Sequence, residues 1–156
     1  MIIWVASYPK SGNTWVRSII SSLIYTEDGI FDFPSIKKID QYPQRRFLEY
    51  FTQDYNNIHE IKKHWITSQE RINLDTKIKF FKTHHLNCKI DNYPFTNKEC
   101  TRATIYIVRD PRNIVSSIKY HFSKDNYIEA KNFLFSENKF LGKKFDETSQ
   151  SKNRDM

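Results

Sequence analysis

The sequence predicts an α/β fold with a central parallel sheet that is flanked by helices. Two stretches, 2–24 and 104–122, support this prediction, because each passes from an apolar run through a short polar loop into a helical pattern. A third apolar run, 78–83, also ends in polar residues. Strands that alternate with helices are typical of a parallel sheet that is covered on both faces.

The first strand and helix enclose a short loop that is suited to an anion. Residues 2–6 are an apolar run, and the loop follows as residues 7–15. The first N–H groups of a helix have no partner within it, and the helix dipole is positive there, so such a loop favours phosphate. Lys10 adds a full positive charge. Apolar residues at helical spacing, which we expect to form the buried face of the helix, are Val16, Ile19, Ile20, Leu23 and Ile24.

This loop does not have the sequence of a Walker A loop, which places two glycines before Lys-Ser or Lys-Thr. Gly12 is its single glycine, Lys10 precedes Gly12, and Pro9 stiffens its start. The loop therefore has the physical features of a phosphate site without the nucleoside-triphosphatase motif. The simpler alternative is an ordinary tight turn with a solvated lysine.

Between the first helix and the next strand, the sequence predicts a loop followed by two helices. Residues 26–41 read as a loop, with Gly29 and Pro34 as breakers, and 44–72 reads as two helices that separate near 54–57.

The next predicted strand, 77–84, ends at the adjacent pair His84 and His85. An irregular connection is expected from 87 to 102.

A buried strand is predicted at 104–108, because the run is β-branched and aromatic. Arg109 ends it, Asp110 is a good helix N-cap, and Pro111 suits the first helical position. One face of the helix is expected to carry Pro111, Val115, Ile118 and Phe122. An arginine at a strand end is a second candidate phosphate site, and the plain alternative is an Arg109–Asp110 ion pair. A further helix is expected after residue 125.

Three predicted strands thus end near Lys10, His84 and Arg109. The carboxyl ends of parallel strands share one edge of the sheet, where ligands bind in open α/β folds. We therefore expect these three residues to converge on one site.

The motifs at these strand ends resemble those of the cytosolic-type sulfotransferases. The run Tyr-Pro-Lys-Ser-Gly-Asn-Thr-Trp at 8–15 resembles their 5′-phosphosulfate loop, and 106–117 resembles their 3′-phosphate motif. Lys82-Thr83-His84 resembles their Lys-Thr-His segment. The resemblance implies a three-layer, P-loop-like fold and transfer of a sulfuryl group from 3′-phosphoadenosine 5′-phosphosulfate (PAPS) to a hydroxyl or amine, without a metal.

The resemblance also implies site residues. Lys10 would stabilise the leaving 5′-phosphate, His84 would take the acceptor proton, and Lys82 would assist near the transferring group. Arg109 and Ser117 would hold the 3′-phosphate. The residues implied to cradle the 5′-phosphate are Ser11, Gly12, Asn13 and Thr14.

Trp15 offers a face for adenine, or alternatively packs in the core. His85 directly follows His84 and leaves the choice of base less secure.

The composition limits the kinds of partner that the chain is expected to bind. The net charge of +7 suits an acidic ligand, and the scattered lysines form no recognisable nucleic-acid module. No apolar run is as long as a membrane span, and two cysteines without metal spacing favour the reducing cytoplasm. The expected acceptor is a small molecule or a glycan, whose identity the sequence does not define. The oligomeric state stays open.

The resemblance covers residues 1–123, and we expect a partial domain at 1–142 followed by a polar, disordered tail at 143–156. The three glycines, Gly12, Gly29 and Gly142, do not form the family's glycine-rich closing motif. We therefore expect a shortened fold with exposed apolar surface and a poor enzyme. A non-catalytic nucleotide-binding remnant is the alternative function, and a P-loop kinase is a weaker one.

Overall fold

The computed structural model describes residues 1–136, so the predicted end of the domain (137–142) and the predicted tail lie outside the described residues. A four-stranded parallel sheet forms the centre, in the order β2-β3-β1-β6. Its strands are β1 (Ile2–Ser7), β2 (Asp40–Gln41), β3 (Lys79–Thr83) and β6 (Thr101–Ile107).

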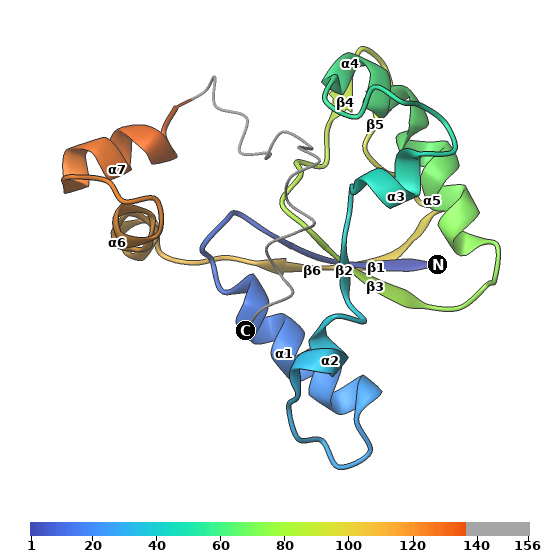
Figure 1. The fold of residues 1–156 in the computed structure, drawn as a ribbon, viewed down its shortest axis with the longest axis horizontal. Helices are drawn as coiled ribbons and strands as arrows, with labels where there is room; N and C mark the ends of the chain where they lie inside the picture. Colours follow the sequence, from blue (N-terminus) through green and yellow to red (C-terminus); the bar gives the residue numbers. More distant parts are fainter. Residues whose placement is uncertain (137–156) are drawn as a thin grey trace.

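Helices lie on both sides of this sheet, which confirms the predicted α/β fold class (Figure 1). One side carries α1 (Asn13–Tyr25) and α2 (Phe33–Ile36). The other side carries α3 (Arg45–Leu48), α4 (Ile58–Ile61), the 3-10 turn η1 (Lys62–His64) and α5 (Trp65–Asn73). The remaining elements are the hairpin β4 (Lys89–Ile90) and β5 (Tyr93–Pro94), and helices α6 (Pro111–His121) and α7 (Tyr127–Leu134).

An aromatic core lies between the sheet and the α3–α5 side. The ring of Trp4, on the central strand, lies 5.6 Å from Tyr42, 6.2 Å from Phe81 and 5.5 Å from Phe95. Its indole Nε1 donates a 2.9 Å hydrogen bond to the Thr101 hydroxyl, so the one polar atom of this buried ring has a partner. This core fixes β1 between its two neighbours.

The helix signals at the start of α6 are confirmed. The Asp110 side chain accepts from the backbone N–H of Arg112, and Pro111 occupies the first turn. The helix predicted after residue 125 is α7, and its buried Ala130 packs against Ile114 and Ile118 of α6. Tyr8, from the first loop, joins this second cluster. The α6–α7 pair therefore contacts the first loop.

Short elements in the middle of the chain were not predicted. The expected loop 26–41 contains α2, which starts at Phe33 and has Pro34 in its first turn, and the strand β2. The expected helical region 44–72 is broken into short helices, with a separation over 49–57 that is wider than expected. The irregular stretch 87–102 contains the β4–β5 hairpin. A strand of two residues is too short to show an alternating hydrophobic pattern, so the sequence does not reveal it. Such a strand forms because it pairs with a neighbouring segment.

The apolar face predicted for α1 is not its buried face. Ile19, Leu23 and Ile24 are 56%, 73% and 51% exposed, whereas α1 buries Asn13, Ser21 and Ser22. Arg17 explains this rotation of the helix, because its Nη2 donates to the carbonyl oxygens of Ile36 (3.1 Å) and Ile39 (2.8 Å). The Ser35 hydroxyl also donates to that of Ser21, at 3.3 Å.

The strand predicted at 104–108 is present as β6, but the prediction that this strand is buried is wrong. β6 lies at the edge of the sheet, and most of its residues are exposed, including Tyr106 at 69%. A β-branched run predicts a strand, but it does not say whether other elements cover that strand. The exposed apolar surface that we expected is present, on β6 and on α1.

Candidate functional site

The three predicted strand ends meet at one edge of the sheet, as expected. In the parallel register, Ala6 of β1 pairs with Thr83 of β3 and Ser7 pairs with Ile107 of β6. Because β1 lies between β3 and β6, the loop after β1 has His84 on one side and Arg109 on the other.

The loop backbone bends sharply before α1 begins. Lys10 and Gly12 both have left-handed backbone angles, with φ of 69° and 101°. The N–H of Ser11 donates to Tyr8 O at 3.3 Å, and that of Val16 donates to Gly12 O at 3.2 Å. No side chain caps the start of α1, and its first turn has no acidic residue. A turn of this kind before an uncapped helix gives N–H groups and a positive dipole end that suit an anion.

The loop side chains divide into buried and open ones. Asn13 is buried and turned toward the sheet, where its Nδ2 donates to Val5 O at 2.9 Å and to the Ser7 hydroxyl at 3.1 Å. Thr14 and Trp15 are exposed, so the packing alternative for Trp15 is wrong. Ser11 Oγ and Asn13 Oδ1 are buried, and among residues 1–136 neither has a hydrogen-bond partner.

Arg109 contacts the first loop. Its Nη1 donates a 2.9 Å hydrogen bond to the carbonyl oxygen of Lys10. Asp110 pairs instead with Arg112, at 2.6 Å from Nη2, so the Arg109–Asp110 alternative is wrong. Ser117 is half-buried within α6, and no hydrogen bond joins it to Lys10 or Arg109 in the described part of the chain.

His84 is held at the end of β1. Its Nδ1 lies 2.7 Å from Ser7 O and 3.2 Å from Ser7 Oγ. Since a carbonyl oxygen only accepts, Nδ1 carries the hydrogen and Nε2 keeps its lone pair. Burial lowers the pKa of His84, the bond to Ser7 opposes this, and the charges of Lys82 and Arg17 lower it further. A neutral imidazole with an available Nε2 is the form that a general base needs.

His85 is partly buried and packs against the aromatic core. Its ring stacks on Phe95, with centroids 5.0 Å apart, and meets Trp65 edge-on at 5.5 Å. Burial lowers the pKa of His85 to about 4. The structure therefore separates the two neighbouring histidines, and the position of His84 suits a base better.

Lys82 lies beside β2. Its Nζ donates to Gln41 Oε1 at 3.3 Å, and burial followed by the Arg17 charge lowers the pKa of Lys82. The sequence did not indicate Gln41, because β2 itself was missed. It also gave no role to Ser7 or Arg17, although Ser7 directly precedes the loop motif.

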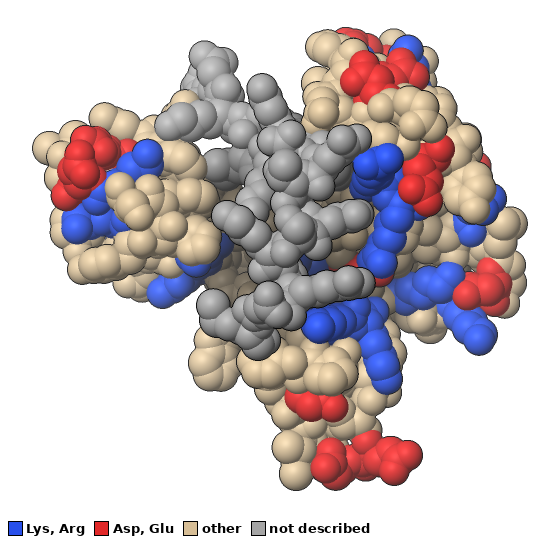
Figure 2. All heavy atoms as spheres, viewed as in Figure 1, with Lys and Arg blue, Asp and Glu red and all other residues tan. Residues whose placement is uncertain are grey.

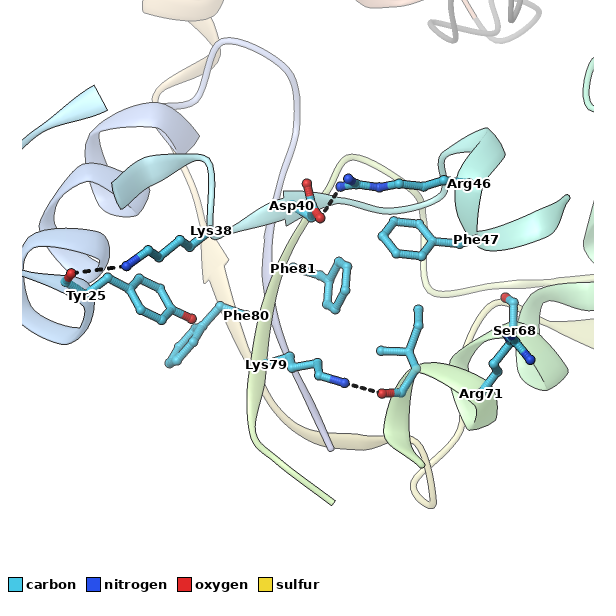
Figure 3. A pocket seen from close by; sticks show the side chains of 11 residues that line it. Tyr25, Lys38, Asp40, Arg46, Phe47, Ser68, Arg71, Lys79, Phe80 and Phe81 are labelled. Carbon is cyan, nitrogen blue, oxygen red and sulfur yellow. Dashed lines mark hydrogen bonds and ion pairs between the residues drawn. The ribbon is translucent and has the colours of Figure 1, made fainter. Parts of the chain in front are cut away.

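A cavity lies away from this edge, beside β2 and the first half of β3. It has a volume of about 460 Å³. Four cationic side chains line it, Lys38, Arg46, Arg71 and Lys79, together with the single carboxylate of Asp40, which pairs with Arg46. Figure 2 shows lysine and arginine side chains gathered near the middle of this face, and Figure 3 shows the aromatic rings between them. Lys79 is bound to Asp75 at 2.8 Å and to Ile72 O, so part of this charge is already paired.

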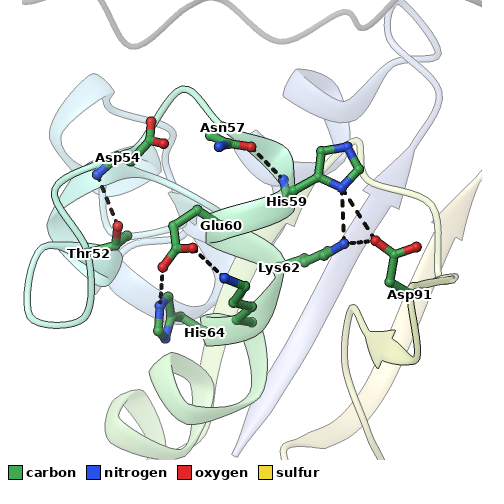
Figure 4. Close-up of polar contacts among 9 residues, drawn as sticks. Thr52, Asp54, Asn57, His59, Glu60, Lys62, His64 and Asp91 are labelled. Carbon is green, nitrogen blue, oxygen red and sulfur yellow. Dashed lines mark hydrogen bonds and ion pairs between the residues drawn. The ribbon is translucent and has the colours of Figure 1, made fainter.

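A second polar cluster ties the β4–β5 hairpin to α4 and η1 (Figure 4). Buried Lys62 pairs with Asp91 and lies 3.1 Å from His59 Nδ1, while Glu60 binds Lys63 and His64 on the opposite side. Each charged group here has a partner of opposite sign, which indicates a structural role.

Within residues 1–136, no helix is both long and apolar enough to cross a membrane, and no group of three or more His, Cys, Asp or Glu side chains could hold a metal ion. A search of curated proteins gives no match. The family model for the sulfotransferase domain matches residues 2–153, nearly the whole sequence. The chain therefore belongs to the sulfotransferase domain family.

Proposed function

We propose that this chain binds PAPS along the edge formed by the ends of β3, β1 and β6, and transfers its sulfuryl group to a hydroxyl or amine of a small molecule or glycan. The contact between Arg109 and Lys10 O carries this proposal. It brings the two motifs assigned to the 5′- and 3′-phosphates into contact, as a nucleotide with phosphates on both sides of its ribose requires.

The residues present fit such a ligand. Ser11 Oγ is buried next to the open start of α1 and lacks a partner among the described residues. A buried hydroxyl without a partner is costly, and a phosphate oxygen would supply one. Gly12 also leaves space, since no heavy atom lies within 4 Å of where its Cβ would be.

In this proposal, His84, Lys10 and the loop each act on a particular group of the reactants. When bound, PAPS supplies an activated sulfuryl group, whose bond to the 5′-phosphate oxygen breaks as the acceptor attacks sulfur. His84 Nε2 takes the acceptor proton, and Lys10 stabilises the negative charge that grows on the leaving phosphate. The N–H groups of the loop and the Thr14 hydroxyl hold that phosphate.

The remaining assigned residues act around the nucleotide. Arg109 and Ser117 hold the 3′-phosphate, and Trp15, exposed at the start of α1, offers a face for the adenine. Lys82 assists the transferring group from the β3 side.

Calorimetry tests the nucleotide assignment. We expect 3′-phosphoadenosine 5′-phosphate (PAP) to bind about 10–100-fold more tightly than AMP, because a charge-assisted hydrogen bond contributes about 1.5–3 kcal/mol. Equal affinities would contradict the 3′-phosphate site. Tighter binding of ATP than of PAP would favour the kinase alternative.

Turnover separates the enzyme from the non-catalytic alternative. Transfer of radioactive sulfate from PAPS to a panel of phenols, amines and oligosaccharides is the readout, and it also identifies the acceptor class. PAP binding without transfer to any of them would favour a nucleotide-binding remnant.

The proposed compartment is the cytoplasm. Cys88 and Cys100 are both free thiols, which suits its reducing environment.

A further inference from the structure

We infer that Ser7 and Asn13 are positioning residues for His84: Asn13 holds Ser7, and Ser7 fixes the imidazole in the tautomer protonated at Nδ1. Its catalytic meaning rests on the proposed function, in which His84 is the base. The tautomer itself is a property of the chain that can be measured without substrate.

The contact between His84 and Ser7 is the first step. Nδ1 lies 2.7 Å from the Ser7 carbonyl oxygen and 3.2 Å from the Ser7 hydroxyl oxygen. Both distances are within hydrogen-bond range, and the shorter one ends on an atom that cannot donate. One residue thus offers two oxygens to the same N–H.

The contact between Ser7 and Asn13 is the second step. Ser7 is buried at the last position of β1, and Asn13 is buried at the first position of α1. Asn13 Nδ2 donates to the Ser7 hydroxyl at 3.1 Å and to Val5 O at 2.9 Å. Because both residues are buried, water competes little for these bonds, and the amide holds the end of β1.

This arrangement decides which nitrogen of His84 is basic. A neutral imidazole can carry its hydrogen on either nitrogen, and the hydrogen bond of one nitrogen selects the state of the other. With Nδ1–H bound to Ser7, the lone pair is on Nε2. When Nε2 accepts a proton from the acceptor, the imidazolium keeps its Nδ1–H bond to the Ser7 carbonyl, which stabilises the new charge.

The inference changes the role expected for Asn13. The resemblance implied a phosphate contact, but the amide is turned away from the open side of the loop and toward the strand. Only its backbone N–H then serves the phosphate. Asn13→Ala should therefore lower kcat about fivefold, while the Kd for PAP stays within about threefold, since one hydrogen bond is worth roughly 1 kcal/mol.

Long-range ¹H–¹⁵N correlation on the ¹⁵N-labelled full chain at pH 8 tests the tautomer directly, with His84→Gln assigning the signal. We expect Nδ1 to be the protonated nitrogen in the unsubstituted chain. Ser7→Ala keeps the 2.7 Å contact with the Ser7 carbonyl and loses only the 3.2 Å contact with the hydroxyl, so we expect it to shift His84 only partly toward the Nε2–H form. Asn13→Ala removes the bonds that hold the end of β1 and should also shift His84 partly toward that form. Ser22→Ala is the matched control, because the Ser22 hydroxyl is also in a buried residue and donates only within α1, to Ser18 O.

An Nε2–H tautomer in the unsubstituted chain would overturn the inference, and this measurement needs no variant to fold. An unchanged tautomer in folded Asn13→Ala would overturn the part of Asn13. The proposed function fails separately: a chain with the Nδ1–H tautomer but no sulfuryl transfer would support this inference and contradict that function.

Discussion

The guanidinium of Arg109 donates a 2.9 Å hydrogen bond to the backbone carbonyl of Lys10, a residue 99 positions earlier. The side chain assigned to the 3′-phosphate therefore also supports the loop assigned to the 5′-phosphate. Tyr8 makes a second connection between the same parts, because it packs against the α6–α7 cluster. The two motifs assigned to the phosphates are therefore in direct contact with each other.

This link predicts that Arg109→Ala weakens binding at both phosphates. We expect the affinity for PAP to fall by about 10–100-fold and the affinity for AMP to fall by a smaller factor, because a charge-assisted bond and a loop support are lost together. Ser117→Ala should weaken PAP binding only, since no hydrogen bond joins Ser117 to the loop among residues 1–136. Calorimetry with both nucleotides measures this, and an Arg109→Ala chain with unchanged AMP affinity would contradict the supporting role.

Lys10→Ala should reduce the rate of transfer far more than nucleotide binding. In the proposed mechanism the ammonium group faces charge that grows as the phosphate leaves, so we expect its loss to lower kcat about 10²–10³-fold with a small change in the Kd for PAP. Lys98→Ala is the control, because the Lys98 side chain is 91% exposed and lies 3.8 Å from Glu99. An unchanged kcat with a raised KM would assign Lys10 to ground-state binding instead.

Acid should destabilise the fold through two partly buried histidines, His85 and His84. Burial lowers the pKa of His85 from 6.5 to about 4, so between these values the unfolded chain binds a proton that the folded chain does not. Stability therefore falls as the pH drops from 6.5 to about 4, by up to about 1.4 kcal/mol per pH unit for one such group.

His85→Phe tests this assignment, because the new ring keeps the contacts with Phe95 and Trp65 and cannot titrate. We expect urea midpoints to depend less on pH between 6.5 and 4 in this variant. Some dependence should remain, because the pKa of His84 is lowered as well. Identical pH profiles for the two proteins would show that His85 is not held neutral by burial.

Local signals explain which parts of the fold could be predicted. The strand that ends at Ser7, the helix after Gly12 and the Asp110 cap each depend on residues that are adjacent in sequence, and each is present in the structure. The meeting of Lys10 and Arg109 at one edge followed from the parallel direction of their strands alone.

Contacts between distant residues explain the errors. The buried face of α1 is set by the bonds from Arg17 to the backbone beside β2, which lies about twenty residues later, so the apolar pattern of the helix could not reveal it. The exposure of β6 depends on its position at the edge of the sheet. The partner of His84 likewise depends on the register between β1 and β3, which places Ser7 beside it.

The left-handed backbone of Lys10 leads to a prediction that distinguishes the effect of backbone strain on stability from the effect of the lysine charge on transfer. Lys10 has a φ of 69°, a left-handed conformation that costs a residue with a Cβ about 1–2 kcal/mol relative to the usual region. Lys10→Gly and Lys10→Ala both remove the ammonium group, so both should lose sulfuryl transfer to the same extent. Only glycine relieves the strain, and its greater freedom in the unfolded chain offsets about 0.4–1 kcal/mol of that gain. We therefore expect Lys10→Gly to be more stable than Lys10→Ala by about 0.5–1 kcal/mol in urea denaturation. A less stable glycine variant would mean that the loop does not hold Lys10 in this conformation, and the anion-binding geometry built on it would then fail as well.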